Sequence, residues 1–352
     1  MTATATLLDG IVAHRVTTPR LTANVLERPS DGATDTVVFV HGNVSSSLFF
    51  QPLMRELPAH LRALAIDLRG FGESETLPVD ATRGVRDFSD DVASVLDELG
   101  IASAHLVGWS MGAGVLMQLM IDRPELVTTA TLEAPVSPYG FGGTGHSGVL
   151  LTPDAAGTGG GAANPDFVAR IDAGDTGDEA QTSPRAVYRS SYVKHPESIA
   201  HEDLWVASML STKTGETNYP GDLVASENWP GFGAGTRGVL NTMAPTHFDT
   251  TGIVDIAAKP PVLWIHGTDD AIVSDASFFD LNYLGKLGVV PGWPGDEVAP
   301  PQPMKQQMRE VLARYRDAGG EITELELPDC GHAPHLDRPA EFRAALLEHI
   351  AR

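Results

Sequence analysis

Cysteine is almost absent from this chain, and basic residues are scarce. Cys330 is the single cysteine, so an intrachain disulfide is excluded and the fold must rely on its core. The chain has 24 lysine and arginine residues against 46 aspartate and glutamate residues, a formal net charge of −22. A surface this negative repels nucleic acids and anionic lipids, so neither is expected as a partner.

Long apolar runs are also missing. No stretch of 18 consecutive apolar residues occurs, and residues 1–20 lack a basic stretch followed by an apolar one. The sequence therefore predicts a cytoplasmic protein with no membrane span. The twelve histidines are scattered, and none forms a pair at metal-ligand spacing such as H-E-x-x-H. We expect no metal and no other cofactor.

The chain does contain an alternation of two patterns. Short apolar runs, typical of strands covered on both faces, alternate with amphipathic stretches at helical spacing such as 85–100 and 304–320. The apolar runs lie at 36–40, 61–67, 105–109, 128–135 and after 260. This order predicts an α/β fold with a mostly parallel, doubly wound sheet.

The alternation stops in the middle of the chain. Residues 138–247 are glycine-rich and aperiodic at first and then carry short helical patches. We therefore expect residues 1–137 and 248–352 to form one core, with 138–247 inserted as a cap. A second irregular stretch, 281–304, is rich in proline near its end. A loop of this length usually has a function, and we expect it to shape an interface in a homo-oligomer.

Ser110 stands at a junction between a predicted strand and a predicted helix. The surrounding residues 108–112 read G-W-S-M-G, a match to G-x-S-x-G, in which small neighbours allow a sharp turn that exposes the serine. A serine needs a base and an orienting acid before it can attack. Asp270 and His332 follow predicted strands in the order serine, acid, histidine, with Asp269 and His335 as the rival residues.

An acyl-transfer site also needs donors for a developing oxyanion. The sequence HGN follows the strand at 36–40 directly. We assign the oxyanion hole to the backbone N–H groups of Asn43 and of Met111, the residue after the serine.

These pieces resemble the α/β-hydrolase superfamily. The matching stretches are VFVHGN, DLRGFGES, GWSMGAG, HGTDDAIV and CGHAPHLDRP, which span 37 to 339. The resemblance implies an α/β-hydrolase fold with Ser110 as nucleophile, His332 as base and Asp270 as its orienting acid, and with 138–247 as the cap. Asp270 is preferred to Asp269 because it directly precedes the triplet AIV.

A narrower resemblance complicates the assignment of the acid. HGN and TLEAP are similar to segments of haloalkane dehalogenases, in which the counterpart of Glu133 is the catalytic acid. That similarity leaves Glu133 as a rival to Asp270, or else as a carboxylate that lines the site or has a structural role. The resemblance to dehalogenases implies an aspartate nucleophile, whereas this chain has Ser110 at that position. A serine attacks acyl carbon, which fits esters, lactones or amides.

The predicted cap carries several large apolar side chains, most of which we expect to form its own core: Trp205, Met209, Tyr219, Trp229 and Phe232. Trp109 and Trp229 are predicted pocket walls, and no cluster of lysine and arginine is evident that would bind a phosphate. The sequence thus favours a serine esterase for a small apolar ester or a lactone. The long cap is similar to that of lactone hydrolases that open zearalenone. The alternatives are a carbon–carbon bond hydrolase of ring-fission products and a non-catalytic hydrolase-like receptor.

Overall fold

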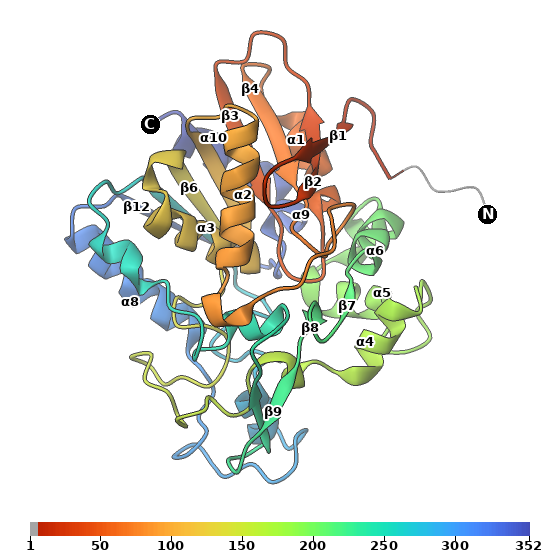
Figure 1. Ribbon diagram of the computed structural model, residues 1–352, viewed down its shortest axis with the longest axis vertical. Helices are drawn as coiled ribbons and strands as arrows, with labels where there is room; N and C mark the ends of the chain where they lie inside the picture. The colour runs from red at the N-terminus through yellow and green to blue at the C-terminus, as the bar shows by residue number, and fades with distance from the viewer. Residues whose placement is uncertain (1–5) are drawn as a thin grey trace.

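An eight-stranded sheet forms the central layer of the protein (Figure 1). The computed structural model describes residues 6–352, and its strands lie in the order β1-β2-β4-β3-β5-β6-β11-β12. From β4 to β12 every neighbouring pair is parallel, whereas β2 pairs antiparallel with both β1 and β4. The mostly parallel α/β sheet predicted from the sequence is therefore confirmed. The strands are β1 Val12–Thr17, β2 Thr22–Arg28, β3 Asp35–Val40, β4 Leu61–Ile66, β5 Ala104–Trp109, β6 Val127–Glu133, β11 Val262–Gly267 and β12 Ile322–Leu327.

Burial explains which strands the sequence revealed. Every residue of β5 and of β11 is buried, so both strands read as continuous apolar runs. In β1, by contrast, five of the six residues are exposed. Strand β1 at the sheet edge therefore lacks an apolar signature, and the sequence patterns did not predict it. Strand β2 was not predicted either, although four of its seven residues are buried.

Helices cover both faces of the sheet. In Figure 1, α2 and α3 pack side by side in front of the sheet, and α10 lies behind it. No helix within residues 6–352 is both long enough and apolar enough to cross a bilayer. The helices outside the 138–247 segment are α1 Gln51–Glu56, α2 Arg86–Glu98, α3 Met111–Asp122, α7 Leu281–Lys286, α8 Met304–Asp317, α9 Pro334–Asp337 and α10 Pro339–Ile350.

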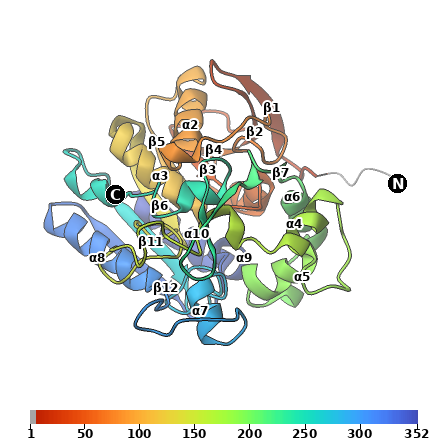
Figure 2. The same cartoon turned by 60° about the horizontal axis from the view of Figure 1, so that its bottom comes forward.

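Residues 138–247 contribute no strand to the central sheet. Together with the stretch 281–304 they lie below the sheet in Figure 1 and come forward in Figure 2. Their core is continuous with that of the sheet domain, because Trp205 of this segment stacks on Phe49 at 5.0 Å between ring centroids. The elements of the segment are α4 Pro165–Asp172, α5 Pro184–Val187, a π-helical turn Tyr188–Tyr192, α6 Glu202–Leu210, β7 Thr214–Gly215, β8 Tyr219–Pro220, β9 Leu223–Ala225 and β10 Phe232–Ala234.

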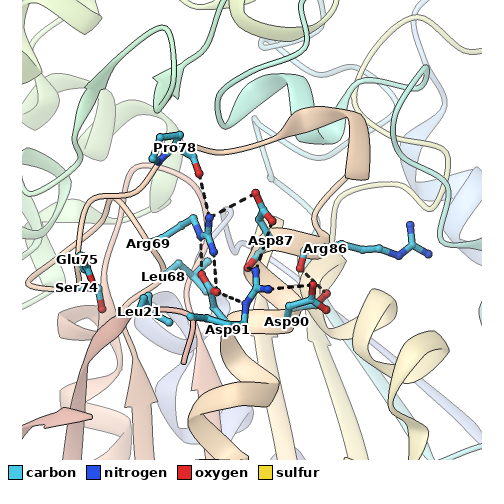
Figure 3. A network of polar contacts seen from close by, with 12 residues as sticks. Leu21, Leu68, Arg69, Ser74, Glu75, Pro78, Arg86, Asp87, Asp90 and Asp91 are labelled. Carbon is cyan, nitrogen blue, oxygen red and sulfur yellow. Dashed lines mark hydrogen bonds and ion pairs between the residues drawn. The ribbon is translucent and has the colours of Figure 1, made fainter. Parts of the chain in front are cut away.

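A buried ionic network attaches the loop after β4 to helix α2. Arg69 donates to both carboxylate oxygens of Asp91, at 2.6 and 2.8 Å, and to the Pro78 carbonyl at 3.0 Å (Figure 3). The side chains of Arg69 and Asp91 are only 8% and 3% exposed. Asp87 lies on the other side of the guanidinium at 3.5 Å. The network fixes a loop whose far end, at Val79, bonds to Thr217 of the 138–247 segment.

We expect Asp91→Ala to destabilise the protein strongly. The substitution leaves the buried charge of Arg69 without its bidentate partner, which typically costs about 3–5 kcal/mol in the free energy of unfolding. Asp97→Ala is the matched control, because Asp97 is 53% exposed and pairs with the surface residue Arg123, so the loss there should stay below about 1 kcal/mol. Urea denaturation of both variants tests this, and equal losses would contradict it.

Candidate active site

Ser110 occupies the turn between β5, which ends at Trp109, and α3, which begins at Met111. Its backbone has φ 58° and ψ −117°, a conformation that a side chain other than glycine adopts only under strain. Two hydrogen bonds hold the strained residue: its N–H donates to the Glu133 carbonyl at 2.8 Å, and its carbonyl accepts from the Val136 N–H at 3.3 Å. The serine side chain is thereby presented at the carboxyl edge of the sheet.

The glycines around the turn are required by close packing. A Cβ on Gly108 would lie 2.5 Å from the Gly112 carbonyl oxygen, and a Cβ on Gly112 would lie 2.2 Å from the Val40 carbonyl oxygen. A Cβ on Gly42 would lie 2.9 Å from the Cβ of Ser110. A larger residue at Gly108 would push β5 and α3 apart, and one at Gly112 would push α3 away from the end of β3, as the G-x-S-x-G pattern predicts. A larger residue at Gly42 would displace the loop after β3 from the serine turn.

His332 is bound to Asp270 and faces the same cavity as Ser110. Its Nδ1 lies 2.9 Å from Asp270 Oδ2, and both side chains are at most 2% exposed. The other oxygen of Asp270 accepts from the N–H groups of Ile272 and Val273, at 2.8 and 2.9 Å. Because the carboxylate binds the Nδ1 proton, Nε2 carries a lone pair that can accept the serine proton. Ser110 and His332 both line the cavity described below.

The rival acid Asp269 points away from the histidine. Its Oδ1 accepts from Lys194 Nζ at 2.7 Å, and that hydrogen bond lowers the pKa of Asp269 below its ordinary value. Asp269 is also more than a third exposed. The structure therefore pairs His332 with Asp270 rather than with its neighbour in the sequence.

Glu133, the second rival, is bound to a different histidine. Its Oε1 accepts from both the backbone N–H and the Nδ1 of His335, at 2.9 and 2.7 Å. Both side chains are completely buried, and neither residue lines the cavity. The expectation that Glu133 contacts substrate is therefore corrected: its carboxylate anchors the start of α9 beneath the loop that carries His332.

The loop after β3 is fixed by a neutral histidine. His41 Nε2 accepts from the Leu68 N–H at 3.0 Å, and its Nδ1 lies 2.8 Å from the Gly42 carbonyl, to which it donates. Burial lowers the pKa of His41, so the ring stays neutral, as this pair of bonds requires. Among residues 6–352 we find no acceptor for the N–H of Asn43 or of Met111, and Asn43 lines the cavity. Both groups are thus free to bind an oxyanion.

A cavity of about 470 Å³ opens above Ser110, a size within the usual range for small-molecule sites. Among residues 6–352, the lining contains no lysine, arginine or glutamate, and Asp280 is its one acidic residue. Burial raises the pKa of Asp280 to about 6, although its oxygens accept the N–H groups of Asn282 and Gln302. The apolar lining residues include Val136, Phe141, Phe167, Tyr192, Tyr219, Leu240, Met243, Phe278, Phe279 and Leu284.

Both predicted tryptophan walls lie elsewhere. Trp109 is 1% exposed, and its Nε1 donates to the His332 carbonyl at 2.7 Å, so it supports the histidine loop from below. The Nε1 of Trp229 donates to the Pro291 carbonyl at 2.9 Å, and its ring packs over Gly285. Sequence reasoning could not predict these contacts, because the partners His332 and Pro291 are distant in the chain.

Several lining residues were missed by sequence reasoning. Tyr192 and the adjacent Phe278 and Phe279 contribute to the cavity, yet no periodic pattern or motif marks them. The stretch 281–304 also contributes to the cavity of its own chain, since Leu281 and Leu284 line it. Its role in a homo-oligomer stays a prediction.

Comparison with known proteins agrees with this architecture. The family model described as "Alpha/beta hydrolase family" matches residues 37–345. The 2-(acetamidomethylene)succinate hydrolase of Mesorhizobium japonicum is 32% identical over 131 residues, which are 37% of this chain and 45% of that protein. This match spans less than half of that relative.

Two solved structures share the fold at low identity. Carboxylesterase CesB of Bacillus subtilis superposes with a TM-score of 0.60 and 18% identity, covering 98% of this chain and 93% of that one. The 2-hydroxy-6-oxo-6-phenylhexa-2,4-dienoate hydrolase of a Rhodococcus species gives a TM-score of 0.55 and 19% identity, covering 97% and 99%. With the family model matched from β3 to α10 and the strained serine in its place, this chain belongs to the alpha/beta hydrolase family.

Proposed function

We propose that the protein is a serine hydrolase of uncharged, apolar carboxylic esters, with lactones as the favoured subclass. The observation that carries the proposal is the opening of Ser110 and of His332, which is paired with Asp270, onto a cavity whose lining is mostly apolar and, among residues 6–352, includes no lysine or arginine. A cavity of this kind binds neutral apolar ligands best. In the same proposal the segment 138–247 acts as a cap, because it supplies much of that lining.

Catalysis begins with attack by the Ser110 hydroxyl on the ester carbonyl carbon. The hydroxyl proton passes to His332 Nε2, and Asp270 stabilises the imidazolium that forms. The negative oxygen of the tetrahedral intermediate is bound by the N–H groups of Asn43 and Met111. The positive end of the α3 dipole lies at the same place and favours that charge.

Collapse of the intermediate breaks the bond between the carbonyl carbon and the leaving oxygen. His332 donates its proton to that oxygen, and in a lactone the resulting hydroxyl remains attached to the acyl group. Water then attacks the acyl-enzyme and gives a proton to His332, which returns it to Ser110 as the carboxylic acid leaves.

A second candidate is hydrolysis of a carbon–carbon bond, the reaction type suggested by the dienoate hydrolase among the structural neighbours. A dienoate carries a carboxylate. Burying it without a cationic partner is costly, and the described residues that line the cavity include no arginine or lysine. This absence favours hydrolysis of esters and lactones over hydrolysis of a carbon–carbon bond.

Steady-state kinetics on three substrates test the proposal: a p-nitrophenyl butyrate, a macrocyclic lactone and a ring-fission dienoate. We expect kcat/KM for the better of the two neutral substrates to exceed that for the dienoate by about 100-fold or more, which corresponds to about 2.7 kcal/mol of uncompensated carboxylate burial. Faster turnover of the dienoate would establish the second candidate instead. Labelling of Ser110 by a fluorophosphonate with no turnover of any of the three would point to a non-catalytic receptor.

A further inference from the structure

One side chain of the 138–247 segment reaches into the catalytic half of the molecule. Tyr192 is the last residue of the π-helical turn Tyr188–Tyr192 and is 5% exposed. Its hydroxyl lies 3.2 Å from the Asn43 carbonyl oxygen and 3.1 Å from the Val44 carbonyl oxygen. A phenol has one proton, so the two carbonyls share it in a three-centre hydrogen bond.

The loop that receives this bond is strained. Val44 has φ 46°, a left-handed conformation that is exceptional for a β-branched residue. Such a conformation persists only where surrounding groups hold it. The tyrosine hydroxyl is one of those groups, and burial raises the pKa of Tyr192 above its ordinary value, so the hydroxyl keeps its proton and remains a donor around neutral pH.

The same tyrosine is bound to the histidine loop. Its carbonyl accepts from the Ala333 N–H at 2.8 Å, one residue beyond His332. Its ring meets the imidazole of His332 edge-on, with centroids 6.2 Å apart, and meets Trp109 edge-on at 5.6 Å. Tyr192 is thus in contact with both the loop that carries Asn43 and the loop that carries His332.

We propose that Tyr192 is a positioning residue whose hydroxyl holds the Asn43–Val44 backbone so that the Asn43 N–H faces the oxyanion. The inference rests on the proposed serine-hydrolase function. The hydroxyl holds the two peptides that follow Asn43, whereas the Asn43 N–H lies in the preceding Gly42–Asn43 peptide. A shift of the held peptides would move the Cα of Asn43 and so displace that N–H from the cavity. A donor misplaced in this way weakens transition-state binding more than substrate binding.

Tyr192→Phe tests this role, and Tyr188→Phe is its matched control. The hydroxyl of Tyr188 is buried in the same turn and has no hydrogen-bond partner within residues 6–352, and Tyr188 does not line the cavity. For Tyr192→Phe we expect kcat on a p-nitrophenyl ester to fall about 10- to 100-fold, somewhat less than the loss of a whole oxyanion donor. KM should change less than about twofold, because ground-state binding does not use the oxyanion hole. Tyr188→Phe should keep kcat within about twofold of wild type.

A second readout separates positioning from general loosening of the structure. Affinity for a boronic acid, which forms a tetrahedral anionic adduct on the serine, should fall in Tyr192→Phe by the same factor as kcat, with the pH profile unchanged in shape. Unaltered kcat in Tyr192→Phe, an equal loss in Tyr188→Phe, or a rise in KM alone would overturn the inference. If wild-type protein neither hydrolyses esters nor reacts with a fluorophosphonate, the proposed function fails instead, so the two failures are distinguishable.

Discussion

Replacing Ser110 with alanine should lower kcat/KM for ester substrates by about 10⁴-fold or more, because the acyl-enzyme can no longer form. The variant keeps Asn43, Met111 and the apolar cavity, so it should still bind substrate with nearly unchanged affinity. Loss of the hydroxyl should not disturb the turn, because backbone hydrogen bonds to Glu133 and Val136 hold residue 110 at its strained φ of 58°. The fold should therefore survive.

Two measurements check this outcome: the rate of hydrolysis of a p-nitrophenyl ester and covalent labelling by a fluorophosphonate. Wild type should be labelled at one site and Ser110→Ala should not be labelled. Ser47→Ala is the control, because the Ser47 hydroxyl is buried without a partner in the described chain and Ser47 does not line the cavity. Ester turnover retained by a folded Ser110→Ala protein would end the serine-hydrolase proposal.

The second large effect is expected from Asp270→Asn, and it decides between the two candidate acids. The amide cannot stabilise the imidazolium and favours the wrong tautomer of His332, so kcat should fall about 10⁴-fold. The residue should remain in place, because an amide oxygen can still accept from the N–H groups of Ile272 and Val273.

Glu133→Gln is the matched comparison, since it makes the same change at the buried Glu133–His335 pair. We expect kcat to stay within about tenfold of wild type, while the free energy of unfolding falls by about 1–3 kcal/mol through loss of a charge-assisted hydrogen bond. Kinetics and urea denaturation on both variants measure the two effects. A collapse of kcat in Glu133→Gln with activity retained in Asp270→Asn would make Glu133 the functional acid.

The pairing of acids with histidines shows how far sequence reasoning reached. Order along the chain and position after strands pointed to Ser110, Asp270 and His332. The same criteria could not separate Asp270 from the adjacent Asp269, or His332 from His335, which lies three residues further on. Only the folded chain separates them: Lys194, which is 75 residues from Asp269, binds one acid, and Glu133, 202 residues from His335, binds the second histidine.

The amino-acid sequence by itself determined the buried parallel strands and the serine turn. These features depend on apolar runs and on glycines two residues from Ser110, which are short-range properties that any reader of the chain can see. Tertiary structure alone decided the pairing of the exposed strand β1 with β2, the burial of Trp109 beneath the site and the contact of Tyr192 with the loop after β3. The contact of Tyr192 with Asn43 joins residues 149 positions apart, and its existence depends on how the whole molecule packs, so no local pattern encodes it.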